Sequence, residues 1–342
     1  MKRFLITVFL FFILCGVINY WLNYDLTYTW GREELHKKHL HFEQEYKKYS
    51  TVFIGSSRFY RHVIPELFDS LQADDKVKSF NFADANMFLP ETYYFLDNFL
   101  QDSLSNSLEN IFIELQYVKK INDLNVNTST VKYYNNLNQL TWVFRYLTNE
   151  SNQEIKTSEY CLNFIKATFL NYINSNDFFD KLSKKIKPDK KLFDYPIQIK
   201  DEGVAFLDTS ESKYLKLGHE EFLEKGLQKD SFNYINKLAN EQALKYNKFH
   251  KATIEYYIEK AKNKGIKLIF VLTPRQKAVM YYSTIPLFKV LPEEHKISIA
   301  SPKQFPELFL LENSFDQYHL NKKGALKFTE YLSKEYDKMK SL

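Results

Sequence analysis

Short apolar runs alternate with helical patterns in two separate parts of this 342-residue chain. Runs rich in β-branched and aromatic residues are typical of buried strands, and the segments between them have helical periodicity. The five predicted strands are residues 51–54, 76–82, 110–115, 267–272 and 296–300. Strands that alternate with helices form parallel sheets through right-handed crossovers. The sequence therefore predicts an α/β domain built on a parallel sheet.

The predicted sheet domain is interrupted in sequence. Its helices are expected at residues 65–71, 89–100, 241–264 and 325–338. Between residues 117 and 240 the strand pattern stops, and aromatic-rich segments without clear alternation take its place. We interpret residues 117–240 as a mainly helical insertion, carried by a domain that consists of residues 51–116 and 241–342.

The first predicted strand ends at Gly55, and Ser56 and Ser57 follow. In open α/β sheets, ligands bind beyond the carboxyl ends of the strands, and a glycine there permits a sharp turn that exposes a hydroxyl. Ser57 is therefore a candidate nucleophile. The same residues also suit an ordinary turn in which a serine caps the next helix. The absence of a Walker lysine argues against a phosphate-binding loop.

A second candidate segment lies near the other end of the chain, where Asp316 precedes His319 by three residues. At this spacing a carboxylate can accept the imidazole Nδ1–H, which leaves Nε2 to take a proton from a hydroxyl. Serine needs such a base because it is a weak nucleophile at neutral pH. The alternative is that Asp316 and Asn321 cap a helix while His319 lies in the loop.

Three blocks of this sequence together resemble the SGNH (GDSL-like) hydrolases. They are Gly55-x-Ser57 after the first strand, Asn81 followed by small residues after the second, and Asp316-x-x-His319-x-Asn321-x-x-Gly324 before the last helix. The resemblance covers residues 50–116 and 241–340. It implies a three-layer, flavodoxin-like parallel sheet, with Ser57 as nucleophile and the Asp316–His319 pair completing a triad. Ser56 stands where many members have aspartate.

The Gly-Ser-Ser form of the first block, together with an apolar N-terminus, looks most like the envelope branch of that family. Members of this branch work beside membrane-bound O-acyltransferases on cell-wall or exopolysaccharide polymers. The resemblance thus implies a serine esterase or O-acyltransferase that acts on acyl esters of an envelope polysaccharide or on small esters. A membrane-bound O-acyltransferase is the implied partner.

Two departures from the family pattern affect the oxyanion hole. Ala83 stands where the second block usually has glycine, and Gln116 follows the third strand where asparagine is usual. The candidate donors are the backbone N–H groups of Ser57 and Ala83, with Asn86 or Gln116 in addition. Loss of one donor typically costs about 100- to 1000-fold in rate. The alternative function is therefore a catalytically weak or inactive scaffold, or a polymer-binding subunit.

Two arginines are candidates for binding an anionic group of the substrate. Arg58 directly follows the candidate nucleophile, and Arg275 follows the fourth predicted strand. Both are expected at the carboxyl edge of the sheet, where a guanidinium can bind a carboxylate or phosphate. Surface ion pairs are the alternative for each of them.

The N-terminal segment is almost entirely apolar from Phe4 to Leu22 and follows Lys2 and Arg3. A helix of about 20 apolar residues spans the hydrocarbon layer of a membrane, and preceding basic residues keep the N-terminus in the cytoplasm. We therefore predict a transmembrane anchor at residues 1–23, a juxtamembrane helix or linker at residues 24–50, and an extracytoplasmic main domain. A cleaved signal peptide is the alternative.

Composition excludes several other functions. The net charge of +5 comes from scattered lysines, and no nucleic-acid-binding motif is present. Cys15 and Cys161 are the only cysteines, so disulfides do not organise the fold. His36, His39 and His41 lack the carboxylate or cysteine spacing of a metal site. We expect no metal, no cofactor and no nucleic-acid partner.

Overall fold

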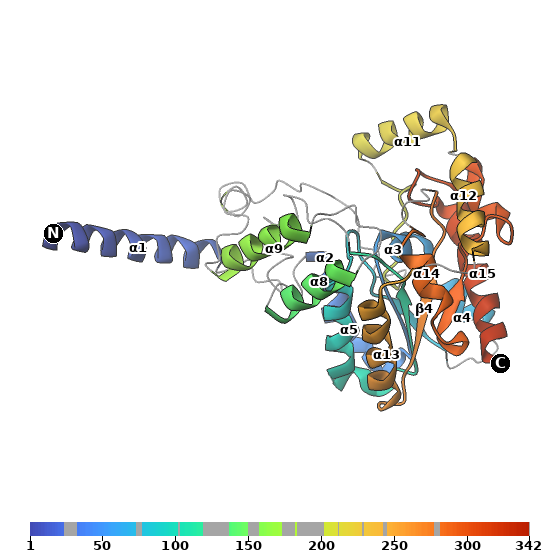
Figure 1. Ribbon diagram of the computed structural model, residues 1–342, viewed down its shortest axis with the longest axis horizontal. Coiled ribbons are helices and arrows are strands. Elements are labelled where there is room, and N and C mark those ends of the chain that lie inside the picture. Colours follow the sequence, from blue (N-terminus) through green and yellow to red (C-terminus); the bar gives the residue numbers. More distant parts are fainter. Residues whose placement is uncertain are drawn as a thin grey trace. The chain divides into compact units, whose positions relative to one another are not determined.

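The computed structural model contains a parallel sheet and the helices that surround it (Figure 1). It describes residues 1–23, 33–72, 77–101, 103–118, 137–149, 157–172, 182, 202–210, 212–227, 229–241, 245–276 and 281–341. The chain divides into two compact units. The first comprises residues 1–36, 120–141 and 155–194, and the second comprises residues 37–119, 142–154 and 195–342.

The five strands of the second unit form one sheet in the order β2-β1-β3-β4-β5. They are β1 (Thr51–Ile54), β2 (Ser79–Asn81), β3 (Asn110–Glu114), β4 (Lys267–Leu272) and β5 (Lys296–Ser298). Every neighbouring pair is parallel. The predicted α/β class and parallel sheet are confirmed, and the strand order is that of flavodoxin-like folds. All five carboxyl ends therefore lie at one edge.

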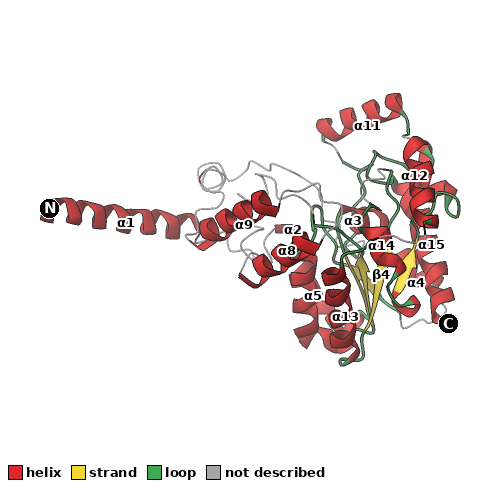
Figure 2. Ribbon diagram, viewed as in Figure 1, coloured by secondary structure: helices red, strands yellow, loops and turns green. Residues whose placement is uncertain are grey.

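Helices cover both faces of this sheet (Figure 2). On one face lie α5 (Glu91–Gln101) and α13 (Lys248–Lys262), and on the other lie α4 (Pro65–Leu71) and α15 (Lys322–Lys340). The short helix α14 (Thr284–Lys289) follows β4. A helix that the sequence did not predict, α3 (Ser57–His62), begins directly after the serine turn.

Aromatic side chains fill the space between the sheet and its helices. On one face Phe53 of β1 and Phe112 of β3 lie 4.9 Å apart between ring centroids, and Tyr336 of α15 packs against Phe112 at 5.0 Å. On the other face Phe82 and Phe99 make an edge contact at 5.0 Å. Both central strands are buried throughout, which explains why they read as continuous apolar runs rather than alternating ones.

Helix α2 (Glu33–Glu45) lies within the predicted juxtamembrane helix or linker of residues 24–50. The side chains of Lys38 and Phe42 are both fully buried. Phe42 stacks on Tyr49 at 5.4 Å and contacts Phe99 edge-on at the same distance. From Lys37 onward this helix therefore belongs to the sheet unit.

The predicted insertion forms α8 (Leu137–Asn149), α9 (Thr157–Tyr172), α11 (Lys213–Lys225) and α12 (Lys229–Asn240). Residues 119–136, 150–156 and 173–201 lie outside the described part, apart from residue 182. Two segments in the later part of the insertion contact the sheet domain. Asn81 at the end of β2 donates its N–H to the Glu202 carbonyl, and the His219 ring of α11 stacks on Phe315 at 4.7 Å.

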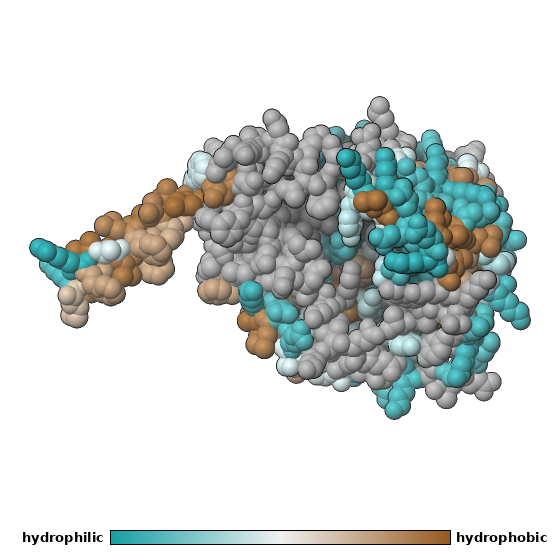
Figure 3. Space-filling view, turned by 90° about the horizontal axis from the view of Figure 1, so that it is seen from above, coloured by the Kyte–Doolittle hydropathy of each residue, from teal (hydrophilic) through white to brown (hydrophobic). Residues whose placement is uncertain are grey.

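The predicted membrane anchor corresponds to α1 (Lys2–Asn23). Its large apolar side chains are exposed, including Phe4, Phe9 and Phe12, and they form the apolar surface of the helix that Figure 3 shows. None of the helices formed by the described residues is both long enough and apolar enough to cross a membrane. The transmembrane anchor therefore stays a prediction.

Candidate active site

The serine turn lies at the carboxyl end of the central strand β1. Ser56 is the N-cap of α3, and its hydroxyl accepts the Arg58 N–H at 3.5 Å. Ser57 is the first residue of that helix, so its own N–H has no acceptor within the helix. The turn thus presents a hydroxyl and a backbone donor of the same residue at the active edge of the sheet.

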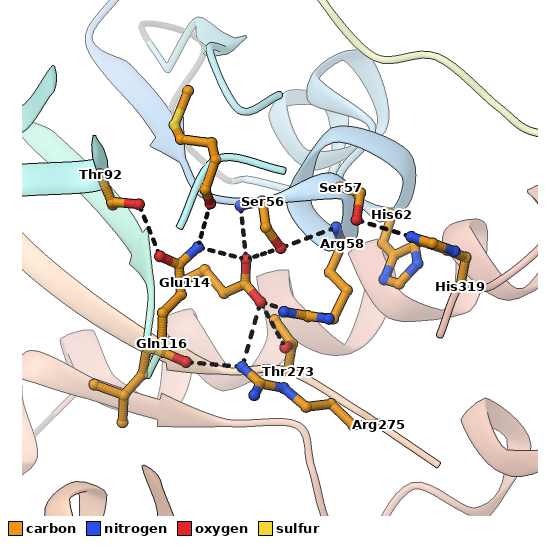
Figure 4. Close-up of polar contacts among 12 residues, drawn as sticks. Ser56, Ser57, Arg58, His62, Thr92, Glu114, Gln116, Thr273, Arg275 and His319 are labelled. Carbon is orange, nitrogen blue, oxygen red and sulfur yellow. Dashed lines mark hydrogen bonds and ion pairs between the residues drawn. The ribbon is translucent and has the colours of Figure 1, made fainter. Parts of the chain in front are cut away.

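The structure brings the two predicted segments together (Figure 4). Ser57 Oγ lies 2.8 Å from His319 Nε2, although 262 positions separate these residues. On the other side of the ring, His319 Nδ1 lies 3.0 Å from both carboxylate oxygens of Asp316. These are the distances and the order of contacts of a serine–histidine–aspartate triad.

The loop that carries Asp316 and His319 is fixed by its own hydrogen bonds. The backbone N–H groups of Tyr318 and His319 donate to Asp316 Oδ1 at 2.6 and 2.8 Å. Burial raises the pKa of Asp316, but the contacts with His319 and these backbone donors outweigh burial and hold the pKa below its usual range. The N-cap of α15 is Asn321, which accepts the Gly324 N–H. Asp316 thus orients the imidazole, and Asn321 rather than Asp316 is the N-cap of α15.

A buried carboxylate that we did not predict supports the nucleophile turn. Glu114, the last residue of β3, accepts hydrogen bonds from the Ser56 N–H at 2.7 Å and the Ser56 hydroxyl at 2.6 Å. It also pairs with Arg58 Nε at 2.5 Å and with Arg275 Nη2 at 3.4 Å. One carboxylate therefore binds the turn on one side and two buried guanidinium groups on the other (Figure 4).

The charge of Glu114 depends on these partners. Burial alone would raise its pKa, but the positive charges of Arg58 and Arg275 and the Ser56 hydrogen bonds lower it to about 2. Burial and the repulsion from Arg58 lower the pKa of Arg275 to about 10, so Arg275 is still protonated at neutral pH. The cluster is therefore charged throughout the physiological range.

Gly55 is required for close packing rather than for an unusual backbone angle. A Cβ atom at this position would lie 2.7 Å from Glu114 Cβ and 3.2 Å from Phe59 Cβ. The described non-glycine residues with positive φ are Asn86 and Glu202, so Ala83 is not strained. Gly55 thus permits the contact between the turn and Glu114.

The predicted oxyanion donors have different surroundings. The Ala83 N–H donates to Asn81 Oδ1 at 3.1 Å. The Gln116 amide donates to the Met87 carbonyl and to Glu114, which uses both of its hydrogens. Asn86 is exposed in a left-handed turn with φ of 62°. The predictions for Ala83 and Gln116 need correction, because their donors are already paired. The Ser57 N–H lies at the start of α3 without an acceptor in that helix, and its oxyanion role stays a prediction.

The second block is held by hydrogen bonds that the sequence analysis did not predict. Asn81 Nδ2 donates to the Phe59 and Val63 carbonyls at 2.8 and 3.0 Å. Lys38 Nζ donates to the Asn81 carbonyl at 2.9 Å and to the Ala83 carbonyl at 2.6 Å. Helix α2 thus contributes a buried cation that fixes the peptides of this block.

Neither predicted arginine serves as an exposed anion site. Arg58 is 2% exposed, and its side chain pairs with Glu114. Arg275 is also 2% exposed and donates to the Leu115 carbonyl at 2.9 Å as well as to Glu114. The alternative prediction, that both arginines form surface ion pairs, is wrong as well, because both pairs with Glu114 are buried. The sequence did contain one signal, since a glutamate at the end of a buried strand requires a cationic partner.

His62 is a further residue that we did not predict. It lies on α3, five positions after Ser57, and its Nε2 accepts the Leu320 N–H at 2.9 Å. Leu320 directly follows the catalytic candidate His319, and the two histidine rings lie 6.3 Å apart. His62 therefore ties the helix of the nucleophile to the loop of the base.

Comparison with known proteins assigns neither a family nor a function to this site. The sequence matches no protein-family model, and no curated protein matches it. In the described part of the chain, no three or more His, Cys, Asp or Glu side chains are arranged to hold a metal ion. The chemistry of the site is therefore argued from its own residues.

Proposed function

We propose that this protein is a serine esterase or O-acyltransferase of the SGNH type that acts on acyl esters. The observation that carries the proposal is the contact chain from Ser57 Oγ through His319 to Asp316, with 2.8 Å to Nε2 and 3.0 Å to the carboxylate. The Gly55-x-Ser57 and Asp316-x-x-His319 blocks resemble that family in the same order.

The reaction begins when His319 Nε2 takes the Ser57 proton and Ser57 Oγ attacks the ester carbonyl carbon. The Asp316 carboxylate stabilises the imidazolium that forms, and the Ser57 N–H faces the developing oxyanion. His319 then gives the proton to the alcohol oxygen as the carbon–oxygen bond breaks, which leaves an acyl-serine. Water or a second hydroxyl, deprotonated by His319, attacks the acyl-serine. The bond between the acyl carbon and Ser57 Oγ then breaks, His319 returns the proton to Oγ, and an acid or a new ester is released.

A fluorophosphonate probe tests the nucleophile, because it labels only serines that a base activates. We expect the probe to label the wild-type protein and to leave Ser57→Ala unlabelled. Ser70→Ala, which removes an exposed hydroxyl of α4, is the matched control and should label like the wild type. Labelling that persists in Ser57→Ala would show that the nucleophile is wrongly assigned.

A second candidate function is a weak or inactive scaffold that binds polymer or a membrane O-acyltransferase. One observation favours it: the Ala83 N–H and both Gln116 amide hydrogens are already paired, which leaves the Ser57 N–H and Asn86 among the four predicted oxyanion donors. Turnover of an aryl acetate distinguishes the two functions. Co-purification with an O-acyltransferase without turnover of any ester would favour the scaffold.

The cellular setting is part of the proposal and depends on the sequence. The apolar residues 4–22 and the basic residues before them favour an N-terminal membrane anchor with an extracytoplasmic main domain. In that setting the substrate would be an acylated envelope polysaccharide, and the partner would be a membrane-bound O-acyltransferase.

A further inference from the structure

A small pocket lies beside His319, on the loop that carries the base. The space open to the centre of a water-sized group is about 10 Å³, and the pocket wall includes His62, Gln276, Leu308, Phe309, Tyr318 and His319. A space of about 10–15 Å³ on this measure holds one water molecule. This pocket therefore has room for about one water-sized group, such as a hydroxyl of a substrate.

His62 brings a hydrogen-bond donor to this pocket wall. Its Nε2 accepts the Leu320 N–H at 2.9 Å, so in the neutral ring the proton is on Nδ1. Burial, together with the charges of His319 and Arg58, holds the pKa of His62 well below its usual range, so the ring is neutral. Nδ1 is buried and has no hydrogen-bond partner among the described residues.

Gln276 brings an acceptor to the same wall. Its Nε2 donates to Ser314 Oγ at 3.0 Å, and the Ser314 hydroxyl in turn donates to the Leu310 carbonyl at 3.0 Å. This chain fixes the orientation of the amide, so the remaining polar atom of Gln276 is the carbonyl oxygen Oε1. That oxygen is buried and finds no donor in the described part of the chain. Gln276 as a whole is 6% exposed.

We propose that this pocket binds a free hydroxyl group on the alcohol half of the ester, so that the substrate is a partly acylated polyol or sugar. A hydroxyl accepts one hydrogen bond and donates another, which matches the His62 donor and the Gln276 acceptor. The alcohol half belongs on this side because His319 must protonate the departing alcohol oxygen. This inference rests on the proposed function and specifies its substrate class.

The test compares two acetates of nearly equal shape, 2-hydroxyethyl acetate and n-propyl acetate. For each we would measure kcat/KM with the full-length protein and divide it by the rate of alkaline hydrolysis of the same ester. A buried donor and acceptor that stay unpaired are costly, so we expect the hydroxylated ester to be preferred by about 10-fold or more.

Variants then locate the preference. In Gln276→Leu the ratio between the two esters should fall toward 1, whatever the overall rate of that variant. Gln304→Leu, at an exposed glutamine, is the matched control and should keep the wild-type ratio. If Gln276→Leu does not fold, the wild-type ratio alone decides.

Equal normalised rates for the two acetates in the wild type would overturn the hydroxyl pocket, while turnover of an aryl acetate would leave the proposed function standing. No turnover of any ester, together with no fluorophosphonate labelling, would overturn both. Glycerol monoacetate and a monoacetylated methyl glucoside then distinguish an acyclic polyol from a sugar ring; faster turnover of either one supports the pocket.

Discussion

The reactivity expected of Ser57 depends on which nitrogen of His319 carries the proton. Asp316 accepts from Nδ1 with both oxygens, which keeps Nε2 unprotonated and directed at Ser57 Oγ. The same carboxylate also accepts two backbone N–H groups of its own loop. Asp316 therefore has an electronic and a structural role, and these can be separated by an isosteric substitution.

Asp316→Asn should lower kcat toward an aryl acetate by about 10³- to 10⁴-fold. The asparagine oxygen can still accept the backbone N–H groups, but its amide would donate to Nδ1 and leave the proton on Nε2. Steady-state kinetics measure the loss, and thermal unfolding checks that the loop is intact. Asp337→Asn, far along α15 in an exposed ion pair, should behave as wild type. A fall of less than 10-fold would contradict the triad.

At the scale of the elements, the site depends on how closely β1, α3 and β3 approach one another. The turn after β1 packs on Glu114 at the end of β3, and Gly55 leaves no room for a side chain between the turn and Glu114. In addition, His62 of α3 accepts the Leu320 N–H, and α15 packs against α3. The nucleophile and its base are therefore held by contacts between elements rather than within one.

Gly55→Ala should lower the free energy of unfolding by about 1–3 kcal/mol, because its Cβ would overlap Glu114 Cβ. The matched control is Gly218→Ala within α11, where a Cβ would meet nothing within 4 Å. That variant should be about 0.5–1 kcal/mol more stable, because alanine favours the helix. Urea unfolding followed by circular dichroism measures both. Equal effects at the two positions would contradict the close approach.

For the whole molecule, the buried Glu114 cluster links stability to pH. The pKa of Glu114 is about 2 in the folded protein against an ordinary value of 4.5. The unfolded chain therefore binds the proton more readily, so the stability that Glu114 contributes is fully present above pH 4.5 and is lost as the pH falls to about 2. Acid should thus weaken the turn that carries Ser57.

Glu114→Gln tests this linkage. The variant should be less stable than wild type at pH 7, because Arg58 and Arg275 lose their buried counter-charge. The difference in free energy of unfolding between the two proteins should shrink by about 3 kcal/mol as the pH falls from 4.5 to 2, because glutamine does not titrate. Urea unfolding at a series of pH values measures it. A difference that stays constant across this range would show that Glu114 is not ionised in the fold.

The proposed membrane placement also concerns the whole chain. We expect the full-length protein to sediment with membranes and to resist alkaline carbonate extraction, because residues 4–22 are apolar. Deletion of residues 1–23 should release the protein without loss of fluorophosphonate labelling, since the triad lies entirely within residues 57–319. A full-length protein found only in the soluble fraction would contradict the anchor.

The sequence by itself determined the α/β class, the approximate strands and the two segments that supply Ser57, Asp316 and His319. These follow from local patterns, because apolar runs, turn residues and a three-residue Asp–His spacing are properties of neighbouring positions. The sequence indicated the Asn321 cap for the same reason, and it also predicted the helix from Pro65 to Leu71.

Only the tertiary structure decided which side chains support that chemistry. Glu114 meets Ser56 across 58 positions, Lys38 meets Ala83 across 45, and His62 meets Leu320 across 258. Each of these partners is buried, and Glu114 also accepts one of the two Gln116 amide hydrogens. A buried polar group must find a partner, but the packing of strands and helices, not their sequence, selects which one.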